Sequence, residues 1–326
     1  MEQREIIKVQ HFLPQCYLQG FAGDNGKLQT LNLELLLEHG KIPYPREFTP
    51  AQLCYEDDFY TLGEGMETFN VKDVADKYTI EKRFHAYENK YRDLISKIEK
   101  GGVLQSDDAA FLIRIIFDLK FRNKYFRDKF IAPRQAEVVN EASDEIRELI
   151  VNDPDYLSKY EGATEAEILT LSDDIRKKLL NDPDFKKNAH LSALYRQEDG
   201  YADALNMLTP KLLHCQWVVL KSDHQFVSND NPGCSMDKNS LIHNSYFERD
   251  FMFFIPLTSS FCLTISDAGI DMDHYNDPRY KRFPVVKAPQ SMIDSSNNFA
   301  FRHFNKFVYG RDKNLLSQLA KTLQTA

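Results

Sequence analysis

The stretch IEKRFHAYENKYRDLISKIEK, from Ile80 to Lys100, decides the fold class of this chain. Its apolar side chains recur at spacings of three and four residues, at Phe84, Tyr87, Tyr91, Leu94, Ile95 and Ile98. That spacing predicts one long amphipathic helix with a single stripe facing a core. Gly101-Gly102 is expected to end the helix. Working outward from it, we predict that the chain is helical from about residue 78 to 213.

A second helix is predicted directly downstream. Ser106 followed by Asp107-Asp108 indicates a helix start, because a hydroxyl cap and acidic first-turn residues suit the positive end of the helix dipole. The apolar stripe of this helix comprises Phe111, Leu112, Ile115, Ile116 and Leu119. Pro133 is expected to stop it. Arg122 projects inside the stripe, whereas Lys120, Lys124 and Arg127 project on the opposite face, which we expect to be solvated.

Two repeated tripeptides mark helix ends farther along the chain. Asp153-Pro154-Asp155 and Asp182-Pro183-Asp184 both break helices, and Thr164-Glu165-Ala166-Glu167 has the pattern of a capping box. They predict an acidic helical hairpin within residues 135–200 that protrudes from the rest of the chain.

Both ends of the chain have strand-like patterns. Residues 7–33 are expected to be extended, with Asp24-Asn25-Gly26-Lys27 as a turn of the hairpin type. In the segment 214–309 two hairpins are predicted, Cys215–Lys221 with Gln225–Ser228 and Phe251–Leu257 with Phe261–Ile265. A helix at Ser291–Asn305, a short strand at Lys306–Tyr309 and a closing helix from Asn314 complete the pattern. The predicted fold is α+β, one domain over 1–326, with a mixed or antiparallel sheet built from N- and C-terminal segments and packed on the helical middle.

Composition narrows the function classes. The net charge of −8 and the pI near 5.6 argue against a protein that coats nucleic acid. No stretch approaches the roughly 20 apolar residues that cross a bilayer, and the first residues have no apolar signal segment. The five cysteines are scattered, which predicts reduced thiols and a cytoplasmic location rather than a zinc site or disulfides. The sequence also contains no Gly-rich phosphate-binding loop.

Two polar residues stand in strand-like apolar segments and are candidates for chemistry. His11 could act as a base, a ligand or a phosphate contact, because an imidazole titrates near neutral pH. It could equally be a half-buried side chain bonded to a main-chain carbonyl. Asp230, in Asp230-Asn231-Pro232, either locks a turn with its side chain or presents a carboxylate at a strand end.

Arg122 carries the sharpest inference, because a guanidinium on an apolar stripe must be paired or it costs several kcal/mol. Glu81 and Glu88 of the preceding helix are its nearest candidate partners in the sequence. One interpretation is a structural ion pair between two helices. The other is that Arg122 binds an anion in a pocket floored by Glu88, His11 and Asp230.

These segments resemble a known family, domain of unknown function 4238. The resemblance rests on Gln10-His11-Phe12-Leu13-Pro14-Gln15-Cys16-Tyr17-Leu18 with Phe21, Phe59-Tyr60, Ile80-Glu81, Tyr87-Glu88, Arg122, Asp230-Asn231-Pro232 after Phe226, Pro256-Leu257 and the late helix through Asn297. It covers nearly the whole chain. The chain departs from the family pattern Thr-Ser-Asp-Asn-Pro, because it has Ser228-Asn229-Asp230-Asn231-Pro232-Gly233. The resemblance implies an order of elements and a set of site candidates, and it implies no chemistry.

Two function classes remain open. The first is a hydrolase acting on a phosphodiester or nucleotide-like anion, a small molecule or a nucleic acid. His11 would be its general base or a metal ligand, and Asp230 and Glu88 its acids or ligands of a divalent metal. Arg122, Gln15, Asn231 and Tyr60 would contact the substrate. The second is a non-catalytic binding module in which the same residues form a structural network and the acidic hairpin is the partner surface. In the enzyme His11 should lie near Asp230 or Glu88 at an open cleft.

Overall fold

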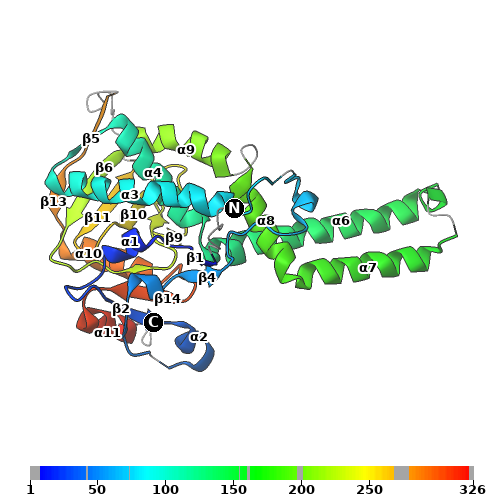
Figure 1. The fold of residues 1–326 in the computed structure, drawn as a ribbon, viewed down its shortest axis with the longest axis horizontal. Coiled ribbons are helices and arrows are strands. Elements are labelled where there is room, and N and C mark those ends of the chain that lie inside the picture. The colour runs from blue at the N-terminus through cyan, green and yellow to red at the C-terminus, as the bar shows by residue number, and fades with distance from the viewer. Residues whose placement is uncertain are drawn as a thin grey trace, which may run out of the picture.

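Figure 1 shows a body of helices and sheets from which two long helices, α6 (Ala132–Asn152) and α7 (Glu165–Asn181), extend to one side. This computed structural model describes residues 8–322 apart from 42, 73, 154, 160–161, 197–200 and 268–278. Helices and several small sheets occupy different stretches of the chain. The protein therefore has the predicted α+β fold.

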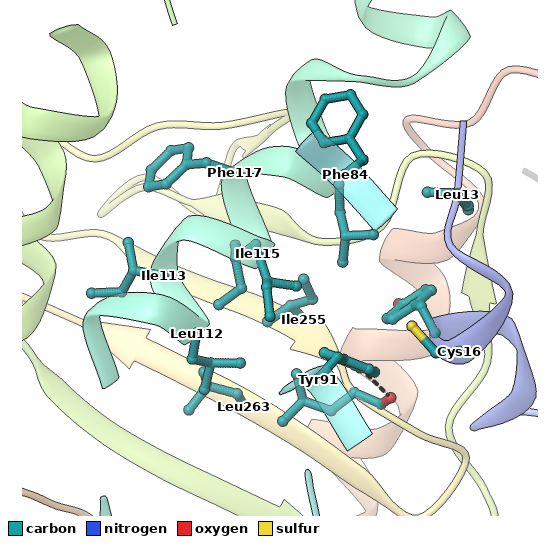
Figure 2. Packing of buried hydrophobic residues seen from close by; sticks show 14 of the residues in the cluster. Leu13, Cys16, Phe84, Tyr91, Leu112, Ile113, Ile115, Phe117, Ile255 and Leu263 are labelled. Carbon is teal, nitrogen blue, oxygen red and sulfur yellow. Dashed lines mark hydrogen bonds between the residues drawn. The ribbon is translucent and has the colours of Figure 1, made fainter. Parts of the chain in front are cut away.

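Two central helices and one sheet form the main core. The predicted amphipathic helix is confirmed as α3 (Thr79–Lys100), and α4 (Ser106–Phe121) follows it. Figure 2 shows Phe84 and Tyr91 of α3 and several side chains of α4 packing against Ile255 and Leu263 of the sheet. All of these side chains are buried. The core therefore joins the helical middle to the C-terminal strands.

The sheet of this core has six strands. In spatial order they are β13 (Val285–Lys287), β6 (Gln216–Lys221), β11 (Phe261–Ser266), β10 (Met252–Pro256), β8 (Cys234–Met236) and β9 (Ile242–His243). Strands β10 and β11 pair antiparallel, which confirms the second predicted hairpin. The first predicted hairpin is wrong, because β6 pairs with β11 and, in parallel, with β13. Its expected partner segment contributes to a different sheet.

A second sheet joins the two ends of the chain. Its order is β3 (Arg46–Phe48), β2 (Leu28–Asn32), β14 (Phe307–Gly310) and β7 (Ser228–Asn229). Strands β2 and β14 pair antiparallel, so N- and C-terminal segments share one sheet as predicted. Two further antiparallel pairs are β1 (Val9–His11) with β4 (Tyr55–Asp57), and β5 (Val103–Gln105) with β12 (Tyr280–Arg282).

The N-terminal segment differs from the extended structure that was predicted for residues 7–33. A short helix, α1 (Gln15–Gln19), begins directly after Pro14. The proline is compatible with this start, because the positions before and at a helix N-terminus need no intrahelical N–H. The turn at Asn25-Gly26 does form, with Gly26 at a φ of 72°. It leads from α1 to β2 and does not close a hairpin.

The end of α4 also differs from the prediction. The helix stops at Phe121 rather than at Pro133, and Asn123 caps the one-turn helix α5 (Lys124–Phe126) by accepting a bond from the Phe126 amide. A π-helical segment (Arg127–Ile131) leads into α6, where Pro133 occupies the first turn. Proline is favoured there because first-turn amides lack intrahelical acceptors. Arg122 thus stands in a break between helices.

The predicted capping box at Thr164 is confirmed at the start of α7. Asp182 caps the next helix, α8 (Pro183–Tyr195), at the base of the α6–α7 pair, whereas Pro154 of the other tripeptide lies outside the described residues. The remaining helices are α2 (Glu34–His39), α9 (Tyr201–His214), α10 (Gln290–Ala300), α11 (Lys313–Thr322) and three short 3-10 turns (Pro50–Gln52, Met66–Phe69, Leu157–Lys159). Helices α10 and α11 correspond to the two late helices predicted. Within the described part, every helix falls short of what a bilayer crossing requires.

Candidate functional site

Arg122 is buried at the break after α4 and is held by two groups from the N-terminal region. Its Nε donates to the hydroxyl of Tyr60 over 3.2 Å, and a terminal N–H donates to the main-chain carbonyl of His11. The guanidinium also lies 4.1 Å from the ring centre of Phe84. Burial alone would lower the pKa of Arg122, but Tyr60 and Glu81 outweigh it and the net shift is upward. The side chain is therefore a fixed cation.

One edge of α3 places three titratable side chains beside Arg122. Nε2 of His85 lies 3.2 Å from Oε1 of Glu81, and its Nδ1 lies 3.9 Å from Oε2 of Glu88. Glu81 is only 3% exposed, and its Oε2 has no hydrogen-bond partner among the described residues. The hydrogen bond to Glu81 raises the pKa of His85, and burial raises the pKa of Glu88 although Arg122 opposes that shift. Spacings of three and four residues put these groups on neighbouring turns.

His11 lies at the end of β1, and its main-chain carbonyl accepts from Arg122. Its Nε2 is 3.3 Å from the carbonyl oxygen of Ala51 and 3.5 Å from Nε2 of Gln15, the first residue of α1. Burial lowers the pKa of His11, while the bond to Ala51 and the charge of Glu81 oppose the shift. If Nε2 carries the proton that Ala51 accepts, Nδ1 has the free lone pair.

We call this group, namely His11, Tyr60, Glu81, His85, Glu88 and Arg122, the Arg122 cluster. It adjoins a cavity of about 20 Å³ that is lined by Pro14, Cys16, Tyr17, Phe84, Glu88, Tyr91, Ile115, Asp118, Leu119 and Arg122. Figure 2 shows the apolar wall of this region at Cys16, Phe84, Tyr91 and Ile115. That volume holds about one water-sized group. Burial raises the pKa of the Cys16 thiol to about 12, so it is no thiolate nucleophile near neutral pH.

Asp230 makes its hydrogen bonds elsewhere. Its two carboxylate oxygens accept from the main-chain amides of Asn305, Lys306 and Phe307 at 2.8, 2.7 and 3.0 Å, at the start of β14. Burial raises its pKa to about 6, and the three amides oppose that shift. Both oxygens are occupied by main-chain donors, as expected of a structural carboxylate. We therefore leave Asp230 out of the reaction proposed below.

Asn231 belongs to the same surroundings. Its Nδ2 donates to Oδ1 of Asn244 over 2.6 Å and to the carbonyl of His303 over 2.8 Å, and its Oδ1 accepts from Asn123 over 2.9 Å. The predicted candidates thus fall into two groups. His11, Gln15, Tyr60, Glu88 and Arg122 lie in or against the Arg122 cluster, and Asp230 and Asn231 lie in a separate network.

Lys120 is a buried cation that the sequence analysis placed wrongly on the solvated face. Its Nζ donates to the carbonyl of Gly233 over 2.6 Å, to Oδ1 of Asn244 over 2.7 Å and to the carbonyl of Asn231 over 3.4 Å. Burial lowers its pKa to about 8. The signal that could have revealed this is the run from Leu112 to Leu119, which is apolar on almost every side and so predicts a fully enclosed helix. We call Lys120, Asn123, Asp230, Asn231 and Asn244 the Asp230 cluster.

With this geometry established, the comparisons with known proteins assign a family. A family model described as Protein of unknown function (DUF4238) matches residues 9–314. The chain belongs to this family. No curated protein and no solved structure matches the chain. The region that matches the DUF4238 family thus contains both polar clusters, and the match assigns no chemistry to either.

The described residues contain no group of three or more His, Cys, Asp or Glu side chains arranged to hold a metal ion. What the Arg122 cluster offers is a fixed cation beside a carboxyl group and an imidazole whose pKa values are displaced in opposite directions. Such a set can bind an anionic group and exchange protons with it.

Proposed function

We propose that this DUF4238 protein is a hydrolase that acts on a phosphodiester or nucleotide-like anion at the Arg122 cluster. The observation that carries the proposal is the pair of opposed pKa shifts at one buried cation: raised for Glu88 and lowered for His11. Burial favours the protonated carboxyl of Glu88 and the neutral imidazole of His11, which are the forms that a general acid and a general base need.

Each residue then has a distinct role. Nδ1 of His11 takes a proton from a water molecule, whose oxygen attacks the phosphorus, and the protonated carboxyl of Glu88 gives its proton to the departing oxygen. Arg122 stabilises the negative charge that builds up on the phosphoryl oxygens. Tyr60 is a positioning residue, because its hydroxyl bonds both the Nε and the main-chain carbonyl of Arg122.

The size of the cavity limits where the substrate lies. A space of about 20 Å³ takes a water molecule or one phosphoryl oxygen, so the remainder of the substrate stays outside it. His85 within the cluster and Gln15 next to it are exposed side chains and would contact that remainder. The unpartnered Oε2 of Glu81 supports this placement, because a buried acceptor without a donor is stabilised by a water or ligand N–H or O–H.

The proposal is tested by turnover of purified protein in a reducing buffer near pH 7, as suits the cytoplasmic location expected from the cysteines. Substrates are RNA, single- and double-stranded DNA and nucleotides, each with EDTA, Mg²⁺ or Mn²⁺, because substrate oxygens commonly help to bind such ions. We expect His11→Ala and Glu88→Gln to lower the rate by roughly 10²-fold or more.

Two matched controls share the chemistry of these substitutions and lie away from the cluster. His39→Ala changes an exposed histidine of α2, and Glu99→Gln changes an exposed glutamate on α3 itself. Both are expected to keep the wild-type rate. Absence of turnover on every substrate, or equal rates for Glu88→Gln and Glu99→Gln, would contradict the proposal.

A further inference from the structure

Polar side chains connect the two helices of the protruding pair α6–α7. Ser143 and Ser172 face each other across the pair at 3.4 Å, Arg147 bonds Asp173, and Arg176 donates to Asn140 over 3.1 Å. In these contacts, residues later in α6 lie opposite residues that are broadly earlier in α7, so the two helices run antiparallel. Several apolar side chains of both helices are consequently left for the outer surface.

Two exposed apolar side chains form a line on each helix. On α6 they are Val138 and Leu149, which are 43% and 38% exposed. On α7 they are Leu171 and Ile175, which are 60% and 49% exposed. At about 100° per residue, Val138 and Leu149 share one side of α6, and Leu171 and Ile175 share one side of α7.

The two lines flank one face of the pair. Counted along each chain, the line on α6 is displaced by roughly 150–170° from the residues that contact α7, and the line on α7 by roughly 110–150° in the same sense from the residues that contact α6. Because the helices are antiparallel, displacements in the same sense turn both lines toward the same side. The half-buried Ile146 and Ile168 project between the two lines on that side. We call Val138, Ile146, Leu149, Ile168, Leu171 and Ile175 the apolar face of α6–α7.

The segment that carries this face is strongly acidic. From residue 132 to 181 the chain has twelve Asp and Glu against six Lys and Arg, a formal net charge of −6 in a protein whose total is −8. Glu145 stands in the line between Val138 and Leu149, and Glu167 stands one turn before Leu171; both are exposed. A partner for this face therefore needs apolar side chains flanked by positive charge.

We propose that the apolar face of α6–α7 binds an amphipathic helix with a Lys- and Arg-rich polar side, contributed by a partner protein. The third helix would cover the apolar side chains that two helices alone leave in water, as in other helix-in-groove complexes. Its positive side would lie against Glu145 and Glu167. A second copy of this chain suits the face poorly, because two segments of charge −6 repel each other.

Figure 1 shows that this pair extends away from the body, so a partner helix can reach it without displacing the core. The probe is a fluorescent Leu/Lys peptide long enough to span α7, with leucines at helical spacing, and fluorescence anisotropy measures its binding to the full chain. A scrambled peptide of identical composition controls for charge alone. At about 0.15 M salt, where surface charge is screened over about 8 Å, we expect the patterned peptide to bind at least about tenfold more tightly than the scrambled one.

The double variant Leu171→Gln/Ile175→Gln should weaken binding of the patterned peptide by about tenfold or more. Val151→Gln is the control, because Val151 is even more exposed, at 74%, but projects on the side of α6 opposite to Val138 and Leu149. Circular dichroism checks that each variant keeps its helices. Equal affinity for the two peptides, or an unchanged affinity in the double variant, would overturn the proposal. A dimer in sedimentation that the double variant dissociates would overturn it too, because the face would then belong to a second copy.

Discussion

Arg122 and Asn123 are neighbours in sequence, yet they belong to two polar clusters of different character. In the Asp230 cluster the carboxylate accepts from three main-chain amides, and Lys120 donates to carbonyl oxygens at close range. In the Arg122 cluster a buried oxygen of Glu81 lacks a partner among the residues that the structure describes, and a small cavity adjoins the guanidinium. Matched hydrogen bonds indicate a structural role, whereas an unmatched group at a cavity indicates a place for a ligand.

The largest effect on stability is expected from Asp230→Ala, because this substitution removes the carboxylate at the centre of the Asp230 cluster. It leaves the amides of residues 305–307 buried without their acceptor, at a cost of about 3–5 kcal/mol in the free energy of unfolding. Urea denaturation measures it, with Asp294→Ala on the exposed side of α10 as control. A loss below about 1 kcal/mol would remove the distinction between the clusters.

Lys120→Met is expected to cost about 2 kcal/mol near pH 7, because the substitution leaves the Gly233 carbonyl and Oδ1 of Asn244 without their donor. Stability should also depend on pH. The folded-state pKa of Lys120 is lowered to about 8 from 10.5, so above pH 8 the unfolded chain binds more protons than the folded one. The stability contributed by this group is fully present above pH 10.5 and is lost as the pH falls through 8.

Urea denaturation at pH 7.5 and near pH 10 checks this dependence. The difference in free energy of unfolding between wild type and Lys120→Met should grow by roughly 2 kcal/mol toward the higher pH. A difference that stays constant would mean that the Lys120 ammonium is not desolvated in the folded protein.

Tyr60→Phe tests the Arg122 cluster in the same way. The variant loses the hydroxyl that bonds Nε and the carbonyl of Arg122, which should cost about 1 kcal/mol of stability. It should also lower kcat, because the guanidinium is then held by fewer contacts. Tyr44→Phe, at an exposed tyrosine, is the control and should change neither quantity. Lost stability with an unchanged kcat would make Tyr60 part of the packing alone.

The sequence predicted the elements that depend on local patterns. The spacing along α3 and the strand–turn–strand pattern of β10 and β11 both fold as expected, because neighbours in sequence supply the contacts. Strand β6 was predicted but its partner was wrong, since its partners β11 and β13 lie forty or more residues downstream. The end of α4 at Phe121 was missed because the cap of Asn123 acts on a single turn.

The same distinction applies to the polar residues. The helical projection placed Arg122 in the apolar stripe and so identified it as buried and partnered. Its direct partners, the Tyr60 hydroxyl and the His11 carbonyl, come from distant loops and strands and have no local signal. Lys120 was missed because its burial depends on the Asn231–Gly233 segment, which packs against α4 only in the folded chain.

The most direct test of the account is the stability of Glu88→Gln near pH 7, measured by urea denaturation beside Asp230→Ala. Burial raises the pKa of Glu88, because it destabilises the charged carboxylate in the folded protein. A neutral amide of the same shape should therefore leave the free energy of unfolding unchanged or raise it. Such a gain in stability is common when the replaced residue serves function. We predict that the Glu88→Gln protein is at least as stable as wild type and that the Asp230→Ala protein is several kcal/mol less stable. A comparable loss in both would contradict it, because the Arg122 cluster would then be as structural as the Asp230 cluster.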